Sequence, residues 1–460
     1  MSAAEDVKDG PLYAAHQKVY ARAVSGRFHR LRVVAVFALL GLYYALPWVR
    51  WDARQAVLFD LPARKFYLFG LTFFPQDFYL LSWLLIIAAL ALFFFTALGG
   101  RLWCGYACPQ SVWTKTFVWI ERFTEGDRMQ RQKLDQRRWD ADKLARKGSK
   151  QLLWVTFALY TGFTFVGYFT PIDALTDEVA HASLGTWETF WVLFHSFATY
   201  GNAGHMREQV CKYMCPYARF QSAMFDQHSL VITYDAARGE PRGARRRGEQ
   251  PKTLGLGDCL DCTMCVQVCP TGIDIRNGLQ LECIACAACI DACDGVMDRV
   301  NYPRGLVRYT TQAAIEGEPT RLLRPRTVVY GTLLVLLISA FLYVATHRPL
   351  VTIDVMRDRN ALYRTVADDR IENVYTVRLV NKDGQAHDVR FEVEELEHYE
   401  LEADADIIHL AAGSVTSTAV RIRVPTGTVS GSRKIEIVAR AVDGSGIQSE
   451  AKARFLGPVK

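Results

Sequence analysis

The sequence predicts a multi-domain membrane protein with an α-helical transmembrane bundle of about five spans, a cysteine-rich α+β module and a C-terminal all-β sandwich. Three observations lead to this fold class. Half of the 460 residues are apolar and gather in long blocks, and eight of the 12 cysteines fall in two regular runs. The end of the chain alternates between apolar and polar residues, as strands do.

The apolar blocks predict the membrane spans, because a helix needs about 20 predominantly apolar residues to cross a bilayer. The expected spans are Leu31–Trp48, Phe78–Leu98, Leu152–Pro171, Trp187–Ala203 and Val328–Thr346. The fourth is the weakest because it contains polar residues, including His195, which indicates either a functional role or a hydrogen bond to a neighbouring helix. No small-residue cleavage site follows the first span, so we expect a retained anchor.

Basic residues predict the orientation of the spans, because short cytoplasmic segments are enriched in Lys and Arg. The segment 122–150 is rich in both, and a second basic group precedes the first span. We therefore expect the amino terminus and this segment in the cytoplasm and, after an odd number of spans, the carboxyl terminus outside. The net charge of +6 is then mostly a signal of topology, and no nucleic-acid partner is expected.

Two runs of cysteines lie between the fourth and fifth spans. Each has the spacing Cys-x-x-Cys-x-x-Cys-x-x-x-Cys, in which three close thiolates hold one 4Fe–4S cluster and the fourth reaches the other cluster. The expected ligands are Cys259, Cys262, Cys265 and Cys293 for the first cluster and Cys269, Cys283, Cys286 and Cys289 for the second. This predicts a two-cluster ferredoxin-like module, although Asp294 stands where proline normally follows the second run. A zinc site and disulfides are disfavoured alternatives, because eight cysteines exceed what tetrahedral zinc needs and the cytoplasm is reducing.

Four further cysteines form two CxxxCP motifs, each after an expected span. WCGYACPQ contains Cys104 and Cys108, and VCKYMCPY contains Cys211 and Cys215. A separation of four residues should place both thiols of a pair on one helix face, and the following proline should bend or end the helix. Because the two motifs occupy corresponding places in the chain, we expect the four thiols to converge near the cytoplasmic face.

Thiols in this arrangement indicate a site for a soft metal ion, of which copper(I) is the commonest biological example. Met206 is close in sequence to the second motif, and so are His205 and Met214, which we include with the four cysteines as candidate metal ligands. Such a residue near a helix end is more often part of the packing or the surface.

The chain after the last span is expected to form strands at 373–381, 388–396, 416–424 and 434–442, with turns at Asp383-Gly384 and Asp443-Gly444. Roughly 110 residues of this kind predict an immunoglobulin-like sandwich with a binding or docking role. The expected domains are 1–235 for the N-terminal segment and four spans, 236–326 for the cluster module and linkers, 327–346 for the fifth span and 347–460 for the sandwich. The stretch 238–252, with Arg245, Arg246 and Arg247, is expected to be a solvated, flexible link.

Together these features resemble the FixG/CcoG/RdxA family over nearly the whole chain. The resemblance rests on the basic amino terminus, both CxxxCP motifs, the two-cluster module, the last span and the exported β-domain. It implies a bacterial inner-membrane protein that assists assembly of cbb3-type cytochrome c oxidase by reducing copper(II) to copper(I), with the four CxxxCP cysteines as copper contacts. The implied partners are a cytoplasmic electron donor and copper chaperones or oxidase assembly factors.

Clusters beside thiols favour a cupric reductase, because electron flow from low-potential clusters to copper(II) is downhill. One alternative is a quinol-linked membrane electron-transfer protein similar to the NapH and NosR type, which shares CxxxCP elements. The other is a non-enzymatic scaffold for oxidase assembly, whose clusters only stabilise the fold or sense redox state. The exported β-domain and the lack of a flavin or haem motif favour the reductase.

Overall fold

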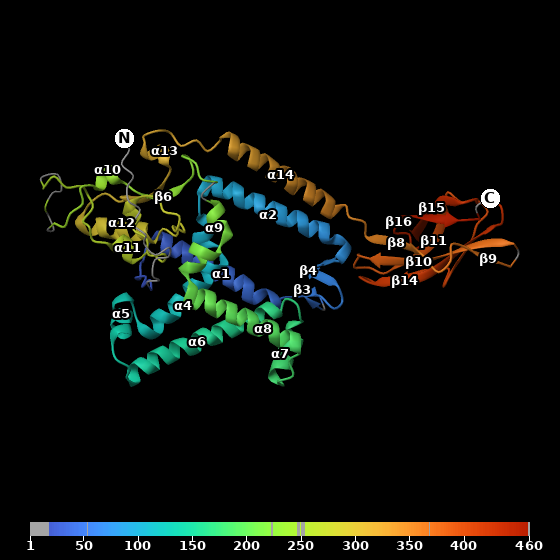
Figure 1. Ribbon diagram of the computed structural model, residues 1–460, viewed down its shortest axis with the longest axis horizontal. Coiled ribbons are helices and arrows are strands. Elements are labelled where there is room, and N and C mark those ends of the chain that lie inside the picture. Colours follow the sequence, from blue (N-terminus) through green and yellow to red (C-terminus); the bar gives the residue numbers. More distant parts are fainter. Residues whose placement is uncertain are drawn as a thin grey trace, which may run out of the picture. The chain divides into compact units, whose positions relative to one another are not determined.

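The computed structural model describes residues 18–52, 54–221, 224–245, 249, 254–367 and 369–458. The chain divides into two compact units (Figure 1). Unit 1 consists of Met1–Ala45, Ala88–Val166 and Ala182–Leu334, and unit 2 consists of Leu46–Ile87, Gly167–His181 and Val335–Lys460. All twelve cysteines therefore belong to unit 1.

Helices dominate unit 1. The helices that lie in it or enter it are α1 (Arg27–Ala45), α2 (Phe78–Gly99), α3 (Leu102–Tyr106), α4 (Pro109–Glu125), α5 (Arg128–Gln136), α6 (Ala141–Val166), α8 (Thr186–Thr199), α9 (Pro216–Gln221), α10 (Ala236–Gly239), α11 (Met264–Gln267), α12 (Ala288–Val300), α13 (Gln312–Ile315) and α14 (Pro325–Thr346). Two π-helical segments, η3 (Tyr200–Met206) and η4 (Val210–Met214), follow α8. Helices α4 and α6 pack through Phe117 and Trp154, whose indole nitrogen donates a 3.1 Å hydrogen bond to the Phe117 carbonyl oxygen.

Three helices of the described chain are long and apolar enough to cross a membrane: Arg27–Trp48, Pro75–Gly99 and Pro325–Thr346. They coincide with the first, second and fifth expected spans. The third and fourth expected spans fall on α6 and α8. Helix α6 begins with several basic residues, and α8 gives way to the π-helical η3 after 14 residues, so neither combines the length and apolar composition of the other three. The number of spans stays a prediction.

The cluster module of unit 1 has α+β character, as expected. Strands β6 (Val231–Tyr234) and β7 (Val307–Thr310) form an antiparallel pair, and they share a core with α12. The expectation of a flexible link is wrong for two of its arginines, because Arg238 forms a 2.6 Å ion pair with Asp258 and Arg245 donates to the Gly257 carbonyl oxygen at 2.8 Å. The rest of that stretch includes Arg246 and Arg247, which lie outside the described residues.

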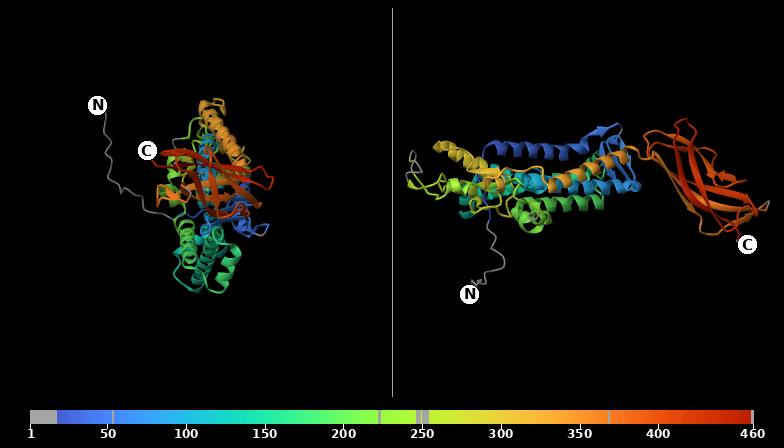
Figure 2. Two further views of the ribbon diagram at one scale, coloured as in Figure 1. Left: turned by 90° about the vertical axis from the view of Figure 1, so that its right-hand side faces the viewer. Right: turned by 90° about the horizontal axis from the view of Figure 1, so that it is seen from above.

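The carboxyl-terminal part of unit 2 is the expected sandwich of two antiparallel sheets, shown from two further directions in Figure 2. One sheet has the order β12-β14-β10-β8 with β9 on β10, and the other has the order β13-β11-β15-β16. The strands are β8 (Val351–Arg357), β9 (Arg364–Val366), β10 (Arg370–Asn381), β11 (His387–Glu394), β12 (Glu400–Ala403), β13 (Ile408–Leu410), β14 (Val415–Pro425), β15 (Ser432–Ala441) and β16 (Gln448–Leu456). The four expected strands correspond to β10, β11, β14 and β15. Their alternating inward residues, such as Tyr375 and Ile437, form the buried core.

Unit 2 also contains the loop between α1 and α2 and the turn after α6. The loop forms a hairpin, β1 (Arg50–Trp51) with β2 (Arg54–Gln55), and a sheet of β3 (Val57–Asp60), β4 (Lys65–Leu68) and β5 (Leu71–Phe73). Helix α7 (Ile172–Ala180) follows the turn. The buried Gln55 side chain joins the two segments, since it donates to the Gly167 carbonyl oxygen at 2.7 Å and accepts from the Ile172 amide at 3.1 Å.

Candidate functional site

The first CxxxCP motif lies at the junction of two helices. Cys104 belongs to α3, whereas Cys108 is the N-cap of α4 with extended backbone (φ −60°, ψ 128°). The expectation that both thiols share one helix face is therefore wrong. Pro109 explains the difference, because proline cannot continue the preceding helix but fits the first position of the next one, where no amide hydrogen bond is required.

The second motif repeats this arrangement with a π-helix in place of α3. Cys211 lies in η4, Cys215 caps it with extended backbone (φ −78°, ψ 111°), and Pro216 begins α9. π-Helical turns are rare and are frequent at functional sites. The internal repeat expected from the sequence is thus present as a shared helix, cysteine, proline, helix order.

Two side chains tie the motifs together. Gln110, directly after the first motif, donates from its amide nitrogen to the carbonyl oxygens of Asn202 at 2.8 Å and Arg207 at 3.1 Å, which precede the second motif. Arg101, directly before the first motif, donates to the Ala218 carbonyl oxygen of α9 at 3.1 Å. The two CxxxCP motifs are therefore held by hydrogen bonds that span distant parts of the sequence.

The four CxxxCP thiols share one partly buried region. Burial, together with the neighbouring Cys108, Cys211 and Cys215, raises the pKa of Cys104 to about 12, although Arg101 opposes this shift. Burial likewise raises the pKa of Cys211 to about 11. Among the described residues no group of three or more Cys, His, Asp or Glu side chains is arranged to hold a single metal ion, so the metal site stays a prediction.

The other candidate ligands have different surroundings. The imidazole of His205 contacts the rings of Tyr200 and Trp154, with centroids 5.0 and 5.8 Å away. Met214 is 56% exposed. His195 packs on Phe165, with ring centroids 3.5 Å apart. The contacts of the two histidines are thus with aromatic rings, and a ligand role for His205 and Met214 stays a prediction.

The cluster module contains two cavities lined by the two expected ligand sets. One is lined by Cys259, Cys262, Cys265 and Cys293 and has an empty volume of about 360 Å³. The other is lined by Cys269, Cys283, Cys286 and Cys289, together with Cys265, and has an empty volume of about 340 Å³. The thiols and the largely apolar walls, which also include Arg276 beside the first set, fit two 4Fe–4S clusters, which are bound by sets of four thiolates.

Several of these ligand thiols have a pKa raised by burial. Burial raises the pKa of Cys283 and Cys293 to about 12, and it raises the pKa of Cys289 well above its usual value. All twelve cysteines are free, so disulfides do not stabilise the module. Asp294, in place of the usual proline, accepts a 2.9 Å hydrogen bond from the Gly305 amide and so stabilises the chain after α12.

The first CxxxCP motif lies directly against the second ligand set. A Cβ atom on Gly105 would be 2.8 Å from the carbonyl oxygens of Ile284 and Ala285, so the two backbones touch where a side chain would not fit. The buried Arg101 guanidinium donates to the carbonyl oxygen of Cys283 at 3.1 Å and to that of Leu281. Sequence reasoning missed Arg101, Gly105 and Gln110. The sequence signal that could have found them is a glycine between the two cysteines of the first motif and a polar residue on each side of that motif.

Comparisons with known proteins agree with this organisation. A family model described as a 4Fe-4S binding domain matches residues 81–122, a 4Fe-4S dicluster domain matches 206–312, and an IG-like fold at the C-terminal of FixG matches 341–458. The chain is 39% identical to the nitrogen fixation protein FixG of Rhizobium meliloti over 81% of this chain and 78% of FixG. It is 41% identical to protein RdxA of Cereibacter sphaeroides over 84% of each chain. A crystal structure of a FixG-related protein from Vibrio parahaemolyticus aligns with 23% of this chain and 95% of its own, at 21% identity and a TM-score of 0.21.

The apolar helices, the two thiol-lined cavities and the 4Fe-4S matches define a membrane-associated iron–sulfur oxidoreductase. The sequence identity to the relatives, over about four fifths of the chain, also shows the protein family. The chain belongs to the FixG/RdxA family.

Proposed function

We propose that the protein is a cupric reductase of the bacterial inner membrane, which supplies copper(I) for assembly of a cbb3-type cytochrome c oxidase. One observation carries the proposal: the backbone of Gly105, between Cys104 and Cys108, touches the backbone of Ile284 and Ala285. Those two residues lie between Cys283 and Cys286 of the second cluster set. A group of thiols suited to soft metal ions is thus in contact with a site suited to electron storage.

The clusters, when bound to the eight module cysteines, supply one-electron transfer. The CxxxCP thiols have their own redox chemistry. Two thiolates give one electron each to two copper(II) ions, which forms two copper(I) ions and one disulfide. Two electrons and two protons would then return the disulfide to two thiols, and clusters held by the eight module cysteines would supply the electrons. Copper(I) prefers sulfur ligands, so the remaining pair of thiols can retain it until transfer.

The raised thiol pKa values make copper binding depend on pH. At neutral pH Cys104 and Cys211 carry protons, and these must leave when a metal ion binds. We therefore expect copper affinity to increase with pH between about 6 and 8, by roughly tenfold per pH unit for each proton released.

The proposal is tested by replacing Cys104, Cys108, Cys211 and Cys215 with serine in the purified, cluster-loaded protein. Copper(II) reduction is followed anaerobically with a chromophoric copper(I) chelator, and the cluster spectrum serves as a check on folding. We expect the spectrum to remain and the reduction rate to fall by more than roughly tenfold, since serine oxygens neither bind copper(I) well nor donate electrons. Unchanged turnover would remove the four thiols from the mechanism.

A second assignment of the same four thiols is favoured by the 4Fe-4S binding model that matches residues 81–122, because this range includes the first CxxxCP motif. Four converging thiols are also the number that one further cluster needs. Iron and sulfide analysis separates the two assignments. If the four thiols handle copper, only the two clusters of the module contribute iron, and we expect about eight irons per chain. If the four thiols bind a third 4Fe–4S cluster, we expect about twelve.

We further propose that the cluster module lies in the cytoplasm and the carboxyl-terminal domain in the periplasm, with copper chaperones or oxidase assembly factors as partners. Cys262 of the first cluster set is exposed, which supports approach of a cytoplasmic electron donor on that side of the module. The first CxxxCP motif contacts the second set, so donor and copper would meet different parts of unit 1.

A further inference from the structure

A cavity with an empty volume of about 1090 Å³ lies within unit 1. Its walls come from the segment 19–24, from α1 and α4, and from the cluster module. Cys211 of the second CxxxCP motif and Cys286 of the second cluster set both line it. The cavity is therefore adjacent to both redox-active parts of the protein, although neither of them requires it.

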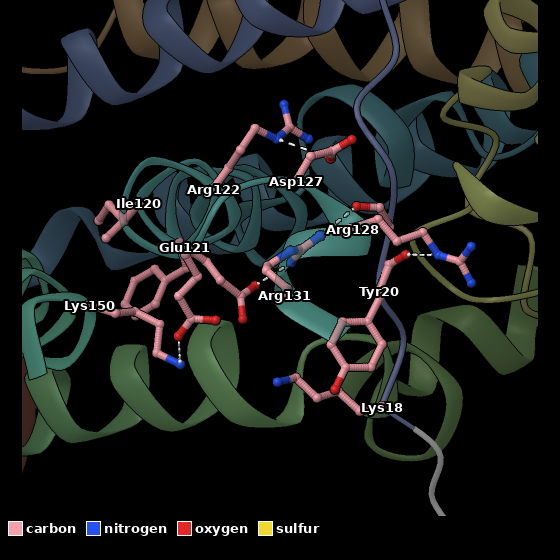
Figure 3. Close-up of polar contacts among 12 residues, drawn as sticks. Lys18, Tyr20, Ile120, Glu121, Arg122, Asp127, Arg128, Arg131 and Lys150 are labelled. Carbon is pink, nitrogen blue, oxygen red and sulfur yellow. Dashed lines mark hydrogen bonds and ion pairs between the residues drawn. The ribbon is translucent and has the colours of Figure 1, made fainter. Parts of the chain in front are cut away.

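Positive charge dominates the polar part of the wall. Seven lining side chains are cationic or can become so, and Glu208 is the one carboxylate among the described lining residues. Two of the seven, Arg131 and Arg207, are neutralised by the buried Glu121 at 2.8 and 3.0 Å, and Figure 3 shows the Arg131 pair. The other five are Arg22, His29, Arg32, Lys115 and Arg122, of which Arg122 forms a 3.9 Å ion pair with Asp127.

Arg32 and Lys115 have no counter-ion in the described part of the chain. No carboxylate there lies within ion-pair distance of either. Arg32 is only 8% exposed, and its Nε and Nη2 atoms are buried without a hydrogen-bond partner among the described residues. Burial, followed by the positive charges of Arg32 and Arg122, lowers the pKa of Lys115 to about 8. A buried cation without an anion is unfavourable, so Arg32 is incomplete without a ligand, and the half-buried Lys115 adds a second positive charge beside it.

The remaining wall is largely apolar. It includes Val36 of α1, a helix apolar enough to cross a membrane, and Val112 and Val118 of α4. Guanidinium groups bind phosphate oxygens with paired hydrogen bonds, and basic pockets beside spanning helices suit the headgroups of anionic lipids. The cations therefore suit a phosphate group, and the apolar residues of the wall suit an apolar portion of the same ligand, such as an acyl chain.

We propose that this cavity binds a phosphate group, that of an anionic phospholipid or of a free phosphate compound, through Arg32, Lys115 and Arg122. The N-terminal segment covers the site. The Arg22 amide donates to the Gln267 carbonyl oxygen at 2.8 Å, and the Arg131 guanidinium donates to the Ala21 carbonyl oxygen at 2.7 Å. Figure 3 shows Arg128 donating to the Tyr20 carbonyl oxygen of the same segment. The bound phosphate is thus enclosed between two redox-active regions.

The test uses the full, cluster-loaded chain in nanodiscs of phosphatidylcholine with or without phosphatidylglycerol. After release from the discs, lipid that remains bound is measured by native mass spectrometry. We expect the native chain to retain phosphatidylglycerol and the variant Arg32→Gln, Lys115→Gln to retain less by roughly tenfold or more, as expected when charged hydrogen-bond donors are lost. The matched control is Arg30→Gln, an exposed arginine of the same helix outside the cavity wall, which should retain lipid normally.

A second arm distinguishes the source of the phosphate. Inorganic phosphate is titrated calorimetrically into delipidated protein, and binding that requires Arg32 without any retained lipid would support the site with a free phosphate compound as its ligand. The proposal would be overturned if the Arg32 and Arg30 variants retained equal amounts of lipid and if substitution of Arg32 left the affinity for inorganic phosphate unchanged. If the double variant loses its iron, Arg32→Lys and Lys115→Gln are measured singly against the same outcomes. None of these readouts involves copper, so the result is independent of the proposed reductase activity.

Discussion

A methyl group at Gly105 would lie 2.8 Å from two carbonyl oxygens of the loop that carries Cys283 and Cys286. The close approach of the two backbones depends on this single missing side chain. Arg101, a few residues earlier, reinforces the contact by donating to the Cys283 carbonyl oxygen. At the scale of residues, the junction of thiols and cluster loop therefore rests on one glycine and one buried arginine.

Gly105→Ala should separate the first CxxxCP motif from the cluster loop. Because the backbone oxygens cannot move away without distorting their loop, we expect a loss of about 1–3 kcal/mol in the free energy of unfolding, together with slower copper reduction. Denaturant unfolding and the copper(I) assay measure the two effects. Gly148→Ala is the control, because no atom lies within 4 Å of its Cβ position in α6 and alanine favours a helix. Equal stability of the two variants would contradict the role of Gly105.

Arg101→Gln should lower the reduction potential of the cluster bound by the second ligand set. The guanidinium is buried and hydrogen-bonded at Cys283, and a nearby positive charge favours the electron-rich state of a cluster. We expect a decrease on the order of tens of mV from the loss of one charge at this range. A redox titration followed by electron paramagnetic resonance measures it, with the cluster of the first set as internal control. A decrease of the same size in both clusters would point to general destabilisation.

At the scale of elements, α4 joins the thiol motifs to the N-terminal part of unit 1. Glu121 of α4 is fully buried and pairs with Arg131 of α5 (Figure 3). It also pairs with Arg207, which connects the two π-helical segments. Burial raises the pKa of this carboxyl, but the two arginines outweigh burial and lower it. The pairs therefore stabilise the unit above the usual carboxyl pKa and lose that effect as the pH falls.

Glu121→Ala should leave two arginines without their counter-ion in the interior. Removal of one partner of a buried pair costs about 3–5 kcal/mol of stability, so we expect marked destabilisation in denaturant unfolding. Asp142→Ala is the control, since its pairs with Arg137 and Arg146 at 2.9 Å are exposed and should contribute little. Similar losses in both variants would show that burial of Glu121 is unimportant.

The turns of the β-domain contain an element that responds to pH. His387 of β11 is bound by Asp383 at 2.9 Å and by Asp443 at 2.8 Å. Burial alone would lower the pKa of His387, but the two carboxylates raise it above its usual value. Stability from this group is fully present below the ordinary histidine pKa and is lost as the pH rises through the higher folded value.

We therefore expect hydrogen exchange of the amides of β11 to speed up as the pH rises above the ordinary histidine pKa of about 6.5, beyond the intrinsic effect of pH on exchange. Mass spectrometry of peptides from β11 measures this. His387→Gln should remove the additional dependence, whereas His409→Gln, an exposed histidine that pairs with Asp388, should keep it. A dependence that persists without His387 would assign it to another group.

At the scale of the whole molecule, contacts within unit 2 bear on the number of spans. The turn after α6 packs on the loop between α1 and α2, through Gln55 and through the 2.7 Å hydrogen bond from the Phe59 amide to the Tyr168 carbonyl oxygen. If α1 and α2 each cross the membrane, that loop lies outside, and Gly167–His181 must lie outside with it. Helices α6 and α8 would then cross the membrane as well, although α6 begins with charged residues and α8 has only 14 residues.

A reporter fusion tests this topology. Alkaline phosphatase inserted after His181 should be active in the periplasm if there are five spans and inactive if there are three. Insertion after Arg137, in the basic segment, should be inactive with either number, and fusion after Lys460 should be active with either number. Phosphatase activity of intact cells, normalised to protein amount, gives the readout. An inactive fusion at His181 would restrict the spans to α1, α2 and α14.

Sequence patterns were sufficient to predict the two sets of cysteines that line the cavities of the cluster module, the three helices that are long and apolar enough to cross a membrane, and four strands of the sandwich. These features depend on short-range spacing and periodicity, which the chain expresses locally whatever its surroundings. Only the folded structure shows that prolines begin new helices after Cys108 and Cys215, that Gly105 touches Ile284, and that Arg32 lines a cavity. Such contacts join residues far apart in sequence, and their energies come from packing and burial, which no local pattern records.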